Sequence, residues 1–155
     1  MSAACQDAEV QRWTTVPVPY RLEHAEHFVG EVAGDTWAAG GALFAVEALA
    51  DGGLVGSMGL HHVRDGVASA GYWTAAGRRG QGLTAEALRV LADWAFDVLG
   101  VRRVELIADP ANTGSNRVAG RAGFSAEGVL RSRYLHRGVP GDVVLWSMLA
   151  GDRTT

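Results

Sequence analysis

A short basic turn rich in glycine is the part of this sequence best suited to chemistry. Residues 77–82 read Gly-Arg-Arg-Gly-Gln-Gly, and an apolar run that reads as the end of a strand precedes them at Trp73. After the turn, apolar residues recur every three or four positions, as in a helix, at Leu88, Leu91, Ala95 and Leu99. A strand, a glycine turn and a helix start in this order predict an anion site, because the first helical amides have no intrahelical partner and the helix dipole adds partial positive charge.

The residue types in the turn favour a phosphate group as the anion. Gly80 and Gly82 can take backbone angles closed to other residues and place no side chain between main chain and ligand. Arg78 and Arg79 add fixed positive charge beside that opening. We therefore expect a phosphate-bearing ligand at this turn.

Two common phosphate motifs fit less well. A nucleoside triphosphate loop needs four residues between its glycines and then Lys-Ser/Thr, whereas one residue separates Gly80 from Gly82 and Leu83-Thr84 follows. Gly80, Gly82 and Ala85 formally satisfy the dinucleotide fingerprint, with Glu105 as a candidate ribose ligand. That fingerprint needs alternating strands and helices, and the segments around this turn read mostly as hairpins.

Five short motifs, taken together in order and spacing, resemble one known family. They are Gly71-Tyr72-Trp73, residues 79–83 (Arg-Gly-Gln-Gly-Leu), Glu86-Ala87, Asn112-x-x-Ser115 and Gly123-Phe124. Over about residues 10–149 the chain resembles the GNAT acyl-CoA-dependent N-acetyltransferases, within their RimJ/RimL-like branch. The family's loop motif usually begins with Gln or Arg, where this chain has Gly77, so one side-chain contact differs while the backbone cradle is kept.

The resemblance implies acetyl-CoA as co-substrate and assigns its contacts. Two strands that splay apart would hold the thioester arm, with main-chain groups near Trp73 and Thr74 serving the arm and the oxyanion. Asn112 and Ser115 would face the same notch. The remaining expected contacts come from the turn and the helix start, at Arg79, Gly80, Gln81, Gly82, Leu83 and Thr84.

Acetyl transfer also needs a base for the amine proton and an acid for the departing thiolate. The family's usual tyrosine acid, seven residues after the asparagine, is replaced by Ala119, which leaves Ser115 as the candidate acid. Glu47 is our candidate for the base. His61 and His62 remain alternatives, and Glu105 is a weaker one.

The resemblance places the acceptor pocket beneath a proline-containing loop that joins the first two helices. Trp13 and Tyr20 are the expected substrate-binding residues there. The ribosomal-protein-modifying members of the family carry an acid near the position of Tyr134, and this difference weakens the case for a ribosomal substrate.

Simpler structural roles stand beside several of these assignments. Asn112 and Ser115 lie where helix caps lie, and Trp73 could be a core residue only. His61 and His62 are consecutive residues of a strand, so one imidazole points to each face, which is poor geometry for a shared metal. We therefore expect no metal site.

Composition restricts the class of protein. A chain of 155 residues with 48% hydrophobic residues fits one globular domain over residues 1–155. A formal net charge of -3 argues against a nucleic-acid binder, and the most apolar windows carry charges, which argues against a membrane protein. The single cysteine, Cys5, suits a reducing compartment, so we expect a cytoplasmic monomer or homodimer.

Periodicity predicts a mixed α/β (α+β) fold. Helices are expected at residues 3–13, 21–32, after the glycine turn, and at 111–122, about four in all. Strands are expected at residues 42–48, 54–63, 67–74, 103–108, 126–135 and 143–149, with a loop through Gly138, Pro140 and Gly141 before the last. The first three form an antiparallel meander, and the fourth lies parallel to the third. The first strand of the resembling fold is missing, which also raises the prospect of a true start upstream of Met1.

The sequence thus predicts an acetyl-CoA-dependent N-acetyltransferase acting on a primary amine, either a peptide N-terminus or a small molecule, by direct attack in a ternary complex. One alternative is a catalytically silent acyl-CoA-binding module that keeps the glycine cradle and lacks a base. A dinucleotide-binding protein is the other.

Overall fold

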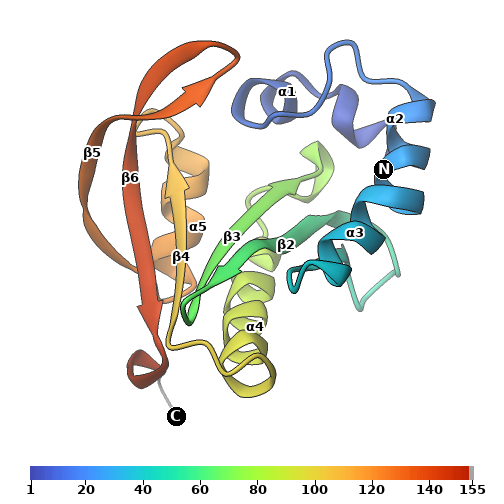
Figure 1. Ribbon diagram of the computed structural model, residues 1–155. Helices are drawn as coiled ribbons and strands as arrows, with labels where there is room; N and C mark the ends of the chain where they lie inside the picture. The colour runs from blue at the N-terminus through green and yellow to red at the C-terminus, as the bar shows by residue number, and fades with distance from the viewer. Residues whose placement is uncertain (154–155) are drawn as a thin grey trace.

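A single six-stranded sheet organises the computed structural model, which describes residues 1–153 (Figure 1). The strand order is β1-β2-β3-β4-β6-β5, and only β3 and β4 run parallel. The strands are β1 Ala42–Glu47, β2 Leu54–Arg64, β3 Val67–Thr74, β4 Arg103–Ala108, β5 Ser125–His136 and β6 Val139–Leu149. The predicted mixed α/β fold, its antiparallel meander and its parallel pair are confirmed.

Four helical runs flank the sheet. The first is α1, Ala8–Trp13, after a short 3-10 turn at Ala4–Gln6. The second joins α2, a π-helical turn and α3 into one run, at Leu22–His27, Phe28–Val32 and Ala33–Ala38. The others are α4, Leu83–Val98, and α5, Thr113–Arg121. The second run continues past the predicted end at Val32 to Ala38, and Gly40 follows with a left-handed φ of 83°, which suits a helix stop.

The main core lies between the sheet and the two later helices. Leu88 on α4 is fully buried against the sheet, where Leu60 on β2 and Val104 on β4 are also fully buried. The apolar stripe of α4 faces the sheet, which is why its helical period was legible in the sequence. A smaller cluster on the other side of β3 holds Cys5, Val10, Tyr20 and Ala25, with Trp73 packed against it.

The connection between the last two strands corrects the sequence-based expectation. The predicted loop is a tight turn at Arg137 and Gly138, both with positive φ, as two-residue hairpin turns require. Pro140 and Gly141 belong to β6. Proline is tolerated there because β4 pairs only with the later part of β6, from Val144 onward, so this end of β6 has one neighbouring strand.

The two parallel strands separate soon after they meet. Val67–Ser69 on β3 pair with residues 103–105 on β4, and no pairing follows, although β3 continues to Thr74 and β4 to Ala108. Figure 1 shows the two strands diverging toward the N-terminal helices. The facing edges therefore carry main-chain groups that no strand occupies, which creates a notch that an extended ligand can enter.

Two further observations concern the first strand of the sheet and the length of the helices. Within residues 1–153 the first strand is β1, which follows the N-terminal helices. None of the helices described has the length and hydropathy needed to cross a membrane.

Candidate functional site

The start of α4 has the backbone geometry of an anion site. Gly80 and Gly82 have φ of 76° and 83°, and Gly82 is the N-cap residue of α4. The amides of Ala85 and Glu86 are the first to bond to the Gly82 carbonyl, at 3.0 and 3.1 Å. Among the described residues no hydrogen bond is made by the amides of residues 80–84, so these donors are available to a phosphate.

The glycine turn is tied to the end of β3. The Thr74 and Thr84 hydroxyls lie 2.8 Å apart, which joins the last residue of the strand to the first turn of the helix. The Gln81 amide donates to the Gly77 carbonyl at 3.0 Å, so this side chain closes the turn. Leu83 is half-buried as the first residue of α4. The turn is therefore held in shape without any ligand.

The two arginines of the turn have different partners. Arg79 donates to the Asp7 carboxylate at the start of α1 and to the Thr74 carbonyl at 3.2 Å. Arg78 turns away to Asp51 in the β1–β2 connection, at 2.8 Å. Each guanidinium lowers the pKa of its carboxylate partner. Of the two, Arg79 is the one linked to the end of β3, beside the notch.

The other wall of the notch is the start of α5. The Asn112 side chain accepts from the Ser115 amide at 3.0 Å, so it caps α5. The Ser115 hydroxyl lies 2.9 Å from the Tyr72 hydroxyl, and Tyr72 also donates to the Ser115 carbonyl at 3.2 Å. Tyr72 belongs to β3 and Ser115 to α5, which follows β4. This contact therefore connects the two sides of the notch.

Tyr72 is a residue whose role the sequence did not reveal, although it belongs to the Gly71-Tyr72-Trp73 motif. Strand alternation puts it on the same face as Ala70, toward α4 and α5. Burial raises the pKa of Tyr72 to about 12, so its hydroxyl is protonated at neutral pH. Ala119, where the family's tyrosine was expected, is fully buried, and the phenol near Ser115 comes from β3 instead.

The two residues expected to bind the acceptor, Tyr20 and Trp13, differ in burial. Tyr20 is buried in the N-terminal cluster, where burial raises its pKa to about 12. Trp13 is half-buried at the end of α1 and donates to the Glu9 carboxylate at 2.8 Å. The Arg12 guanidinium lies 4.5 Å from the centre of its ring. Trp73, on β3, packs against the same N-terminal cluster to which Tyr20 belongs.

The β5–β6 hairpin binds the end of α1 and the loop that follows it. Arg137, at the hairpin turn, donates to the carbonyls of Gln11, Thr14 and Val16 at 3.0, 3.4 and 2.9 Å. Figure 1 shows the hairpin bending toward α1. The loop after α1 is thus fixed by a residue more than a hundred positions away in the sequence.

Two of the candidate bases are badly placed. Glu47 is exposed at the end of β1, at the edge of the sheet, and β2 lies between it and β3. Glu105 is bound to Arg103 at 2.9 Å. Arg103 also makes two bonds with Glu127, at 2.6 and 2.8 Å. Neither Glu47 nor Glu105 is a free carboxylate at the notch.

The two histidines lie differently from the sequence-based expectation. A β-bulge between Leu60 and His62 interrupts the pairing of β2 with β3. His62 pairs with Ser69, and His61 lies over Gly71, which belongs to the same face of β3. The expectation that one imidazole would point to each face was therefore wrong, because it assumed a regular strand. No group of three or more potential metal ligands occurs among residues 1–153.

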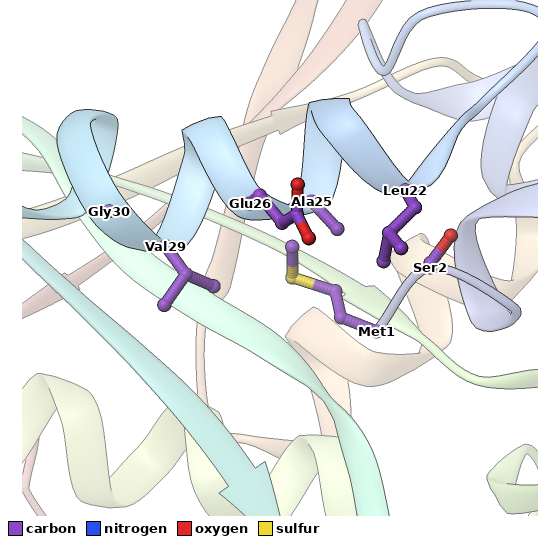
Figure 2. A pocket seen from close by; sticks show the side chains of 7 residues that line it. All are labelled: Met1, Ser2, Leu22, Ala25, Glu26, Val29 and Gly30. Atoms are coloured by element: carbon purple, nitrogen blue, oxygen red, sulfur yellow. The ribbon is translucent and has the colours of Figure 1, made fainter.

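An apolar hollow of about 470 Å³ lies elsewhere on the molecule (Figure 2). Figure 2 shows that residues from the chain start and from the helical run that begins with α2 surround it. Its walls are Met1, Ser2, Leu22, Ala25, Glu26, Val29 and Gly30. It contains none of the residues expected at the site.

Known acetyltransferases are similar to this chain in sequence. The sequence model of the acetyltransferase (GNAT) domain matches residues 1–125. A Bacillus subtilis (strain 168) protein, YjcK, named as a probable N-acetyltransferase, is 33% identical over 112 residues, which are 70% of this chain and 62% of YjcK. YdaF of the same strain, named as a candidate ribosomal N-acetyltransferase, is 38% identical over 104 residues, 65% of this chain and 56% of YdaF. The chain thus spans about 60% of the length of these two curated relatives.

A solved structure shares the fold. Mycobacterium smegmatis RimJ, in complex with CoA-disulfide, superposes with a TM-score of 0.80 at 26% identity. The match covers 97% of this chain and 75% of that one.

Proposed function

Because the chain belongs to the GNAT acetyltransferase domain family, we propose that it moves an acetyl group from acetyl-CoA to a primary amine. The amine attacks the thioester directly, with both substrates bound at once. The chain itself forms no covalent intermediate in this scheme.

One observation carries the proposal: the notch between β3 and β4 ends at a row of free amides. The pairing of these strands stops after Ser69, and the available amides of residues 80–84 lie past the end of β3. An extended arm with a diphosphate at one end matches this arrangement, since a strand-like arm can use the open edge of β3 and the diphosphate can take the helix amides. RimJ, which was solved with a CoA derivative, has the same fold.

Each part of the site then has a task. Residues 80–84 and Arg79 hold the phosphates, and main-chain groups near Trp73 and Thr74 hold the arm and stabilise the oxyanion. Asn112 holds the start of α5 in shape, and the Ser115 hydroxyl donates a proton to the departing thiolate. The loop bearing Trp13, supported by Tyr20 and pinned by Arg137, borders the acceptor.

The acceptor class is a peptide N-terminus or a small amine. The name of YdaF supports a ribosomal-protein N-terminus. Tyr134, where ribosomal-protein-modifying members carry an acid, favours the small amine. The experiment should therefore include both kinds of acceptor.

Release of free thiol from acetyl-CoA tests the proposal across a panel of peptides with free N-termini, polyamines and aminoglycosides. We expect release that depends on one class of amine and yields the acetylated amine. Tight CoA binding without release of free thiol in the presence of any amine would identify a catalytically silent binding module. Binding of NAD in preference to CoA, measured by calorimetry, would contradict the proposal and favour a dinucleotide-binding protein.

A further inference from the structure

The β-bulge in β2 gives His61 an unusual position. Pairing of β2 with β3 moves from Leu60 opposite Ala70 to His62 opposite Ser69, which leaves His61 as the extra residue. A bulge redirects the side chain of its extra residue and often occurs beside active sites. In this chain it turns a second imidazole to the face of β3 that carries Trp73.

The His61 ring lies directly against the β3 backbone at Gly71. A Cβ added to Gly71 would be 2.5 Å from the His61 Nε2 atom and 2.9 Å from its Cδ2 atom. The lack of a side chain at Gly71 therefore makes room for the ring. Gly71 and Trp73 are two residues apart on one face of the strand, about 7 Å along β3. His61 thus lies one strand repeat from the main chain assigned to the thioester.

The ring is also free to accept a proton. No hydrogen bond or ion pair within residues 1–153 involves its nitrogens, and the residue is exposed to solvent. Packing against the protein, with a smaller effect of the neighbouring His62, lowers the pKa of His61 below its ordinary value of 6.5. The imidazole is therefore neutral at neutral pH, the form in which it can act as a base.

Other charged groups on this face do not compete for that role. β3 presents Ser69, Gly71 and Trp73, none of which titrates in the neutral range. β4 presents Glu105 opposite Ser69, and it is bound to Arg103.

The N-terminal cluster over Trp73 contains two titratable groups. They are Cys5 and Tyr20, and burial raises the pKa of both, so they are neutral. Beyond these, the neighbour that acts on His61 is His62 on its own strand.

We propose that His61 is the general base of the reaction, an assignment that rests on the proposed function. The imidazole takes a proton from the amine, directly or through one water, as the amine nitrogen bonds to the thioester carbon. The C–S bond then breaks, the thiolate takes a proton from the Ser115 hydroxyl, and Ser115 regains a proton from water. His61 returns its proton to solvent, so the products are the acetylated amine and free CoA.

The test measures kcat/KM for the amine between about pH 5 and 9 in three proteins: the parent, His61→Gln and His62→Gln. Glutamine keeps a polar side chain of similar size but cannot titrate. In the parent, kcat/KM should fall on acidification in two steps, one from the amine and one from His61 below pH 6.5. His61→Gln should lose the lower step and about 100-fold in kcat/KM at pH 7.5, with KM for acetyl-CoA within about twofold.

His62→Gln is the matched control, because it removes the adjacent imidazole on the same strand. It should keep both steps and stay within about threefold of the parent rate. The lower step should move to higher pH, since the charge of His62 no longer opposes protonation of His61. His61→Ala provides a second check: its cavity over Gly71 should allow added imidazole to restore part of the rate, and His62→Ala should show no such rescue.

The outcomes separate this inference from the proposed function. A parent that transfers no acetyl group to any amine would overturn both. An active parent whose His61→Gln variant keeps the lower step, or whose rate changes less than about threefold, would overturn the assignment of His61 alone. So would loss of the lower step in His62→Gln.

Discussion

Asp7 and Arg79 connect the first helix, α1, to the glycine turn before α4. The Asp7 carboxylate caps α1 by accepting from the Val10 amide at 3.0 Å, and it also accepts from the Arg79 guanidinium. Arg79 is the arginine beside the notch. One carboxylate therefore holds both the start of α1 and the arginine expected to meet a phosphate.

We expect Asp7→Asn to bind CoA about two- to fivefold more tightly. Asparagine keeps an oxygen that can cap α1 but removes the charge that competes with a phosphate for Arg79. The matched control is Asp51→Asn, which makes the same change beside Arg78 and should alter affinity less than twofold. Weaker CoA binding by Asp7→Asn in calorimetry would mean that the carboxylate positions Arg79 instead of competing for it.

Gly82→Val should abolish measurable CoA binding in a folded protein. Apart from neighbouring residues of the chain, no atom of residues 1–153 lies within 4 Å of an added Cβ at Gly82, so the added side chain would fill the space open to the ligand. The φ of 83° adds strain of about 1–3 kcal/mol. Gly40→Val is the control, because Gly40 has the same φ and an equally open surrounding. We expect the two variants to have similar melting temperatures and only Gly82→Val to lose CoA binding. Unchanged CoA affinity in Gly82→Val would contradict an anion site at this turn.

Trp13→Ala should raise KM for the amine about tenfold and leave KM for acetyl-CoA nearly unchanged. Trp13 is the last residue of α1 and precedes the loop whose Thr14 and Val16 carbonyls bind Arg137. Steady-state kinetics with each substrate varied in turn measures the two constants. Equal increases in both would show that the loop supports the fold and not the acceptor.

Ser115→Ala should slow single-turnover acetyl transfer about ten- to a thousandfold, with little change in acetyl-CoA affinity. Tyr72→Phe should slow it about fivefold, because its hydroxyl contacts both oxygens of Ser115. If Tyr72 acts through Ser115, the Tyr72→Phe change has no further effect in Ser115→Ala. Additive losses in the double variant would assign Tyr72 a separate role, and a parent-like rate for Ser115→Ala would leave thiolate protonation to water.

The Arg103–Glu127 pair should make stability depend on acid pH. Two bonds from Arg103 and one from the Ser147 hydroxyl, at 2.6 Å, lower the pKa of Glu127 to about 2 from an ordinary 4.5. A lowered carboxylate pKa stabilises the fold above pH 4.5, and this contribution is lost as pH falls through about 2. Glu127→Gln should therefore melt lower than the parent at pH 7, with the difference shrinking toward pH 2. A difference that is constant with pH would show that the ion pair contributes nothing.

The sequence predicted those parts of the site that depend on local order along the chain. The bounds of β3 and β4 and the glycine turn between β3 and α4 follow from apolar runs and turn residues, which are local signals. The extra turns of the α2 run were missed because its apolar period weakens after Val32 although the helix continues.

Contacts between distant segments were not predictable in the same way. Tyr72 and Ser115 are 43 residues apart, and Asp7 and Arg79 are 72 apart. The position of His61 depends on a one-residue change of register against β3, which periodicity within β2 cannot indicate. These relationships become visible only when the packing of distant segments in the fold is known.

The central claim is that the notch between β3 and β4 is where an acetyl group passes directly from acetyl-CoA to an amine. The most direct measurement follows isotope-labelled acetyl-CoA in a single turnover, with mass spectrometry of both the protein and the amine. We predict that label enters the amine at the rate at which free thiol appears, that it never accumulates on the protein, and that Gly82→Val transfers none. Label that fails to reach any amine, or that first accumulates on a side chain of the protein, would contradict the account.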